Sequence, residues 1–104
     1  MAALLATRAM PAPDRIDPLM AAINHFIFSG DAYDALPEDL SEEEDAEAFE
    51  RLCNEPDRVL KQWGTPATSY EGAIAALRLA LDDEDLAPSL IKAALAYFDR
   101  SAAQ

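Results

Sequence analysis

The chain has 104 residues, of which 51% are hydrophobic, and eight basic side chains against twenty acidic ones give it a net charge of −12. A chain of this length supports one domain with a single modest core. So negative a surface repels nucleic acid and anionic membranes, so direct binding to either is not expected.

Composition favours an all-α chain, because alanine supplies much of the hydrophobic content and only three glycines are present. The single cysteine, Cys53, excludes an internal disulfide bond and suits a reducing compartment. No segment approaches the roughly 20 apolar residues of a membrane span. We therefore expect a helical protein of the cytoplasm.

The N-terminal segment is expected to be a flexible tail over residues 1–15. It carries two prolines in an alanine-rich run, and its apolar residues follow no strong helical period. Its opening residues, Met1–Ala6, are too few for the core of a signal peptide. Residues 16–104 are then expected to form a single helical domain.

A first helix is expected at about 17–35, since Asp17 can cap it and Pro18 fits its first turn. The side chains on its core-facing stripe are Leu19, Met20, Ile23, Phe26, Ile27, Gly30 and Tyr33. Phe28 points almost opposite this stripe, where a monomer would expose it to water. Either a neighbouring segment covers Phe28, or Phe28 marks a second contact surface such as a dimer seam.

A second helix is expected at about 41–63, opened by a capping box between Ser41 and Glu44. Its expected apolar seam has heptad spacing and consists of Ala46, Phe49, Cys53, Pro56, Leu60 and Trp63. Pro56 should break the helix, yet the seam keeps its phase, so we predict one kinked helix or two collinear pieces. Gly64 is expected to end it in a left-handed conformation.

Two shorter helices are expected at about 69–82 and 88–101. The former is apolar nearly all round, so Ile74, Leu77 and Leu81 should all be wrapped by neighbours. Its predicted start is a capping box between Thr68 and Glu71, and its predicted end is the acidic run Asp82–Asp85. The predicted fold is therefore all-α, a four-helix arrangement in which a long antiparallel hairpin packs with a shorter one.

Little in the sequence points to catalysis. His25 is the only histidine, and no second histidine or cysteine stands beside it at metal-ligand spacing. Ten acids lie between Asp31 and Glu50 with no base among them, but they lack the alternating ligands and turn glycine of an EF-hand. We expect no enzymatic activity, no cofactor, no metal site and no catalytic residue.

Two segments carry a resemblance to other proteins. One is Asp17-Pro18-Leu19-Met20-Ala21-Ala22-Ile23 followed by His25, and the other is Thr65-Pro66-Ala67-Thr68-Ser69 followed by Glu71-Gly72. In these segments the chain resembles a group of short, uncharacterised helical proteins common in α-proteobacteria. Proteins of this group are often encoded near mobile or phage-like genes, so the resemblance implies an accessory role without a known activity.

The sequence thus favours a non-enzymatic, acidic interaction module, expected to be a homodimer joined through the first helix, with or without the seam of the second. The alternative is an acidic inhibitor that occupies a basic groove on a nucleic-acid-handling protein. The expected partner is a basic protein surface, a second copy, or both. The candidate partner-binding residues are Phe28, His25, Glu38, Asp39, Glu42, Glu43, Asp45 and Glu47.

Overall fold

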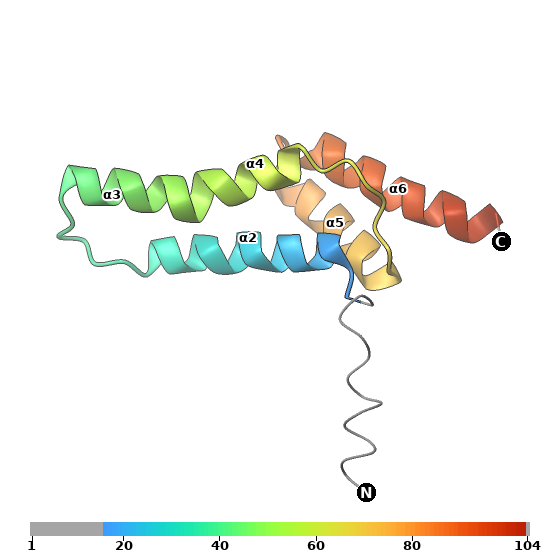
Figure 1. Ribbon diagram of the computed structural model, residues 1–104, viewed down its shortest axis with the longest axis horizontal. Coiled ribbons are helices and arrows are strands. Elements are labelled where there is room, and N and C mark those ends of the chain that lie inside the picture. Colours follow the sequence, from blue (N-terminus) through green and yellow to red (C-terminus); the bar gives the residue numbers. More distant parts are fainter. Residues whose placement is uncertain (1–15, 104) are drawn as a thin grey trace, which may run out of the picture.

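The computed structural model describes residues 16–103, which are all-helical and contain no strand (Figure 1). The predicted fold class is confirmed, whereas the predicted tail at residues 1–15 lies outside the described part of the chain. No helix in the described part combines the length and apolarity that a membrane crossing requires. The elements are α2 (Pro18–Asp34), α3 (Glu42–Phe49), the π-helix η2 (Glu50–Asn54), α4 (Glu55–Lys61), α5 (Tyr70–Asp82) and α6 (Ala87–Ala103).

The long hairpin consists of α2 and the continuous run of α3, η2 and α4, which lie antiparallel (Figure 1). The short hairpin of α5 and α6 packs where α2 begins and α4 ends, with α5 against α2 and α6 against α4. We call residues 27–54, the part of the long hairpin that projects beyond this junction, the arm. The residues of the main buried core cluster all lie outside the arm: Leu19, Ile23, Leu60, Ala67, Ala73, Ala76, Leu86, Leu90, Ala93 and Ala94.

The junction is held by Asp17, the predicted cap of α2, whose side chain is only 4% exposed. Its Oδ1 accepts from the Leu19 N–H at 3.0 Å, as an N-cap should. Its Oδ2 accepts from the Thr68 N–H at 3.1 Å and from the Ser69 N–H and hydroxyl at 3.1 and 2.8 Å. One carboxylate therefore binds the N-terminal ends of α2 and α5, where the helix dipole favours negative charge.

This contact explains why the predicted start of α5 is one residue early. Because the Thr68 N–H is donated to Asp17, the cap is Ser69, whose hydroxyl accepts from the Gly72 N–H at 2.9 Å. A Cβ on Gly72 would stand 1.8 Å from Asp17 Oδ2. Gly72 is thus required for close approach of the carboxylate, since none of the described glycines has a positive φ.

The second helix passes Pro56 without a loop, as predicted, but through the π-helix η2. The Glu55 N–H donates to the Glu50 carbonyl, five residues back, just before the proline that has no N–H to give. One residue inserted in a helix rotates the preceding face by about 100°. As a result Ala48 shares the buried side with Pro56, and the predicted seam residue Ala46 is exposed.

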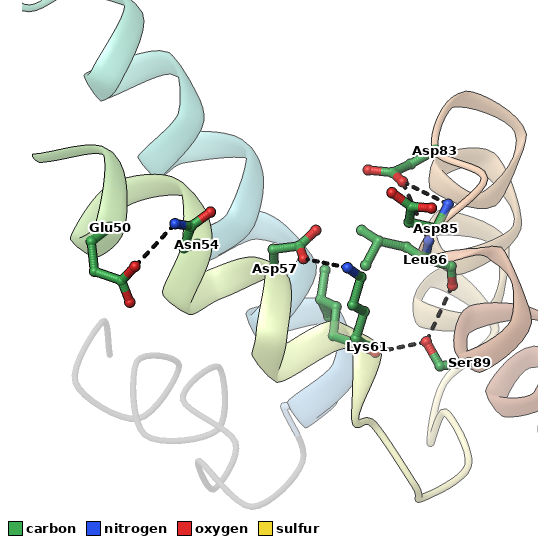
Figure 2. Close-up of polar contacts among 9 residues, drawn as sticks. Glu50, Asn54, Asp57, Lys61, Asp83, Asp85, Leu86 and Ser89 are labelled. Carbon is green, nitrogen blue, oxygen red and sulfur yellow. Dashed lines mark hydrogen bonds and ion pairs between the residues drawn. The ribbon is translucent and has the colours of Figure 1, made fainter. Parts of the chain in front are cut away.

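The helix ends differ from prediction at Gly64, which does not adopt a left-handed conformation. The α4 segment ends earlier, at Lys61, and the N–H of its C-cap Gln62 donates to the Arg58 carbonyl at 3.1 Å. The acidic run ends α5 as predicted, and Asp83 Oδ1 accepts from the N–H groups of Asp85 and Leu86 to start α6 (Figure 2).

The prediction that α5 is wrapped on every side is wrong at Leu81, which is 86% exposed, whereas Ile74 and Leu77 are half-buried. Helices α2 and α6 supply most of the cover of α5, and the closest packing of α4 in this region is on α6. The hydroxyl of Ser89 joins α6 to α4 by donating to the Leu60 carbonyl at 2.7 Å (Figure 2).

Candidate functional site

The tip of the arm is organised around Tyr33. Its hydroxyl donates to Asp45 Oδ1 at 2.8 Å, and its ring meets the Phe49 ring edge-on at a centroid distance of 5.3 Å. The hydrogen bond to Asp45, together with some burial, raises the pKa of Tyr33. The predicted capping box is confirmed: the Ser41 N–H donates to Glu44 Oε1 at 3.0 Å, and the Glu44 N–H donates to the Ser41 hydroxyl at 3.1 Å.

Charge in the arm is almost entirely negative. Ten acids lie between Asp31 and Glu50. Only two of them form an ion pair among the described residues: Glu47 lies 3.7 Å from Arg51, and Glu50 lies 2.6 Å from Arg58. The hydrogen bond from Arg58 lowers the pKa of Glu50. Both pairs are exposed and contribute little to stability. The other acids of this segment form no ion pair among the described residues, so the tip keeps a dense uncompensated negative charge.

The predicted partner-binding residues fall into two separate groups. The acids Glu38 and Asp39 lie in the connection after α2, and Glu42, Glu43, Asp45 and Glu47 lie on α3, so the fold gathers them at the tip. Phe28 and His25 instead lie on α2 away from the buried Leu19, about 180° and 120° from it around the helix axis.

Phe28 is 74% exposed, and no segment of the described chain covers it. His25 is also exposed, with its Nε2 3.4 Å from the Ser29 hydroxyl. The strip of Ala21, Asn24, His25, Phe28 and Ala32 on this side of α2 is small or neutral, and we call it the outer face. The exposed Asp31, three residues after Phe28, borders it. No acid, lysine or arginine occurs in α2 before Asp31.

An apolar groove of about 460 Å³ runs along the opposite side of α2, between α2 and the helix that returns. Its apolar lining is Phe26, Ile27, Phe49, Leu52 and Cys53. Sequence reasoning missed this groove because it assigned Phe26 and Ile27 to the core stripe. The stripe does face the second helix, but the arm has no third helix to fill the space, and Ile27 remains 49% exposed.

Cys53 is half-buried in the groove, and this burial raises the pKa of its thiol, with a further contribution from the nearby Asp34 carboxylate. Three acids border the groove: Asp31, Asp34 and Asp57. Of these, only Asp57 has a basic partner among the described ion pairs, Lys61 at 3.2 Å (Figure 2).

The described side chains hold no group of three His, Cys, Asp or Glu residues that would suit a metal ion. The long hairpin offers three distinct surfaces for contact: the outer face of α2, the acidic tip and the acid-bordered apolar groove. No protein-family model, no curated protein and no solved structure matches the chain.

Proposed function

We propose that this protein is a non-enzymatic interaction module that acts in the cytoplasm in an accessory or regulatory role, and that it forms a homodimer through the outer face. The observation that carries the proposal is Phe28, a large side chain left 74% exposed on a helix whose opposite side is buried. Isolated exposed apolar residues are common, but this one is flanked along the helix by the small Ala21 and Ala32. Small flanking residues let a second helix approach closely.

Charge also supports this choice of face. Each copy carries a net charge of −12, so association is opposed by repulsion unless the contact avoids the acids. The stretch from Pro18 to Gly30 is free of acids, lysines and arginines. Two copies that cross at Phe28 bring together neutral segments and keep both acidic tips apart.

Light scattering on the full chain tests the proposal. The wild-type chain of 11.3 kDa should show twice this mass at tens of micromolar, and Phe28→Asp should return it to the monomer. The matched control is Leu81→Asp, which introduces the same charge at another exposed apolar residue, outside the outer face. A monomeric wild type would refute self-association, and a Phe28→Asp variant that remains a dimer would refute the outer face as the interface.

A second candidate function follows from the acidic tip and the segment around it, in which ten acids and no base lie between Asp31 and Glu50. In this alternative the tip occupies a basic groove on a nucleic-acid-handling protein, as expected of a phage or mobile-element accessory protein. A complex held by exposed charges should weaken strongly at about 0.5 M salt, where the screening length is only a few ångströms. A complex isolated from cells that is unaffected by this salt would exclude the tip as its contact.

A further inference from the structure

The groove of the arm lies where a third helix could pack against α2 and the returning helix. Near the junction, α5 packs against α2 and supplies that layer. The groove begins where this cover ends, since Ile27 lines both the space between α2 and α5 and the groove itself. Beyond Ile27 the two helices of the arm pack only on one another, and their inward apolar side chains stay partly exposed.

The floor of the groove is accessible. Ile27 and Phe49 are 49% and 44% exposed, and a Cβ placed on Gly30 would meet no atom within 4 Å. Along α2 the groove extends from Phe26 to Asp34, which at 1.5 Å per residue is about 12 Å, or two turns. This length suits two or three apolar side chains of an approaching helix, spaced at three or four residues.

The acidic residues at the border of the groove favour a positively charged partner. Asp31 and Asp34 are exposed, and neither takes part in an ion pair among the described residues. A second copy of this chain seated here would bring more acids toward these carboxylates, at a Coulomb cost. A helix with lysine or arginine beside its apolar stripe would instead place positive charge against them.

We propose that the groove binds a basic amphipathic helix of a partner protein, with apolar side chains against Ile27, Phe49 and Leu52 and basic ones beside Asp31 and Asp34. This site rests on the proposed interaction role, but it is separate from the outer face. Recognition by an apolar groove with an acidic border selects for helical phase and for charge at the same time.

Fluorescence anisotropy on the full chain tests the site with three labelled synthetic peptides. The probe is an amphipathic helix with leucines on one side and lysines beside them. One control has the same composition with the leucines dispersed around the helix, and the other has glutamates in place of the lysines. The probe should bind at least about tenfold more tightly than either control, a difference of about 1.4 kcal/mol.

Two adjacent residues provide matched variants. Ile27→Asp should weaken probe binding at least about tenfold, whereas Phe28→Asp adds the same charge on the outer face and should leave it within about twofold. The double variant Asp31→Asn, Asp34→Asn changes only exposed side chains, so it serves if Ile27→Asp fails to fold. It should weaken binding and reduce its salt dependence.

Absence of probe binding, equal binding of the dispersed control, or full binding by the Asn double variant would each overturn the groove assignment. These outcomes are distinct from failure of self-association, which is measured by mass and responds to Phe28→Asp. A wild type that is monomeric yet binds the probe through Ile27 would retain the groove and refute the dimer.

Discussion

The close contact between Asp17 and Gly72 predicts that alanine in place of this helical glycine lowers the stability of the protein. Replacing a helical glycine with alanine commonly stabilises a protein by up to about 1 kcal/mol, because alanine loses less backbone entropy on folding. At Gly72 the new Cβ would stand 1.8 Å from Asp17 Oδ2 and 2.8 Å from Asp17 Cγ. Neither atom can remain in place, so the carboxylate must leave its position between the two helices.

The cost follows from the bonds that the carboxylate would lose. Asp17 Oδ2 accepts three hydrogen bonds from Thr68 and Ser69, and hydrogen bonds to a charged group contribute about 1.5–3 kcal/mol each. Loss of two of them, less the gain of about 1 kcal/mol from alanine, gives a net loss of roughly 2–5 kcal/mol in Gly72→Ala. That is a large share of the 5–15 kcal/mol that is typical of a domain.

Urea unfolding followed by far-UV circular dichroism measures this loss as a lower midpoint at unchanged slope. Gly30→Ala is the matched control, since it lies within α2 and its added Cβ meets nothing within 4 Å. It should raise the free energy of unfolding by about 0.5–1 kcal/mol.

A double-mutant cycle isolates the cause. In an Asp17→Ala background there is no carboxylate for the Cβ of Gly72→Ala to displace, so the second change should cost nothing or stabilise slightly. Additive losses in the cycle, or a Gly72→Ala protein as stable as the wild type, would refute the close approach.

Three further predictions concern single contacts. Since the pKa of Cys53 is raised, little thiolate exists near neutral pH, and iodoacetamide should react with it more slowly than with a free cysteine peptide; equal rates would contradict its burial. The pKa of Tyr33 is raised in the folded state, so its hydrogen bond to Asp45 stabilises the fold below the pKa of the unfolded chain and is lost as pH rises through the pKa of the folded state. The difference in free energy of unfolding between wild type and Tyr33→Phe should therefore fade above about pH 10. Ser89→Ala should cost about 1 kcal/mol in urea unfolding, and an unchanged midpoint would show that the bond from α6 to α4 contributes nothing.

The sequence predicted most of what depends on near neighbours in the chain. The caps at Asp17 and Ser41 were identifiable because their partners lie two or three residues away, and Pro56 signalled an interruption for the same reason. The hydrogen bonds between Asp17 and Ser69 join residues 52 positions apart in the sequence, and no local pattern around either residue predicts them. Gly72 was therefore not recognised as a packing requirement.

Helical periodicity identified apolar faces but not which of them would find a cover. Leu81 and Ile27 carry the same signal as buried residues, and their exposure follows from where the neighbouring helices end. The groove depends on that same information, and so it could not be predicted. The position of Phe28 opposite the apolar stripe of its own helix was predictable, but whether a neighbouring segment covers it was left open, and the structure leaves it 74% exposed.

The buried core lies apart from the acidic tip and from most of the apolar groove. The buried core and the Asp17 contact lie at the junction, whereas within the arm only Ser29 and Ala48 are buried. The π-helix lies at the base of the arm, and its extra residue turns Ala48 toward the side of Pro56. Changes on the arm surface therefore affect little of the core, and the arm can present apolar side chains to a partner while the junction maintains the fold.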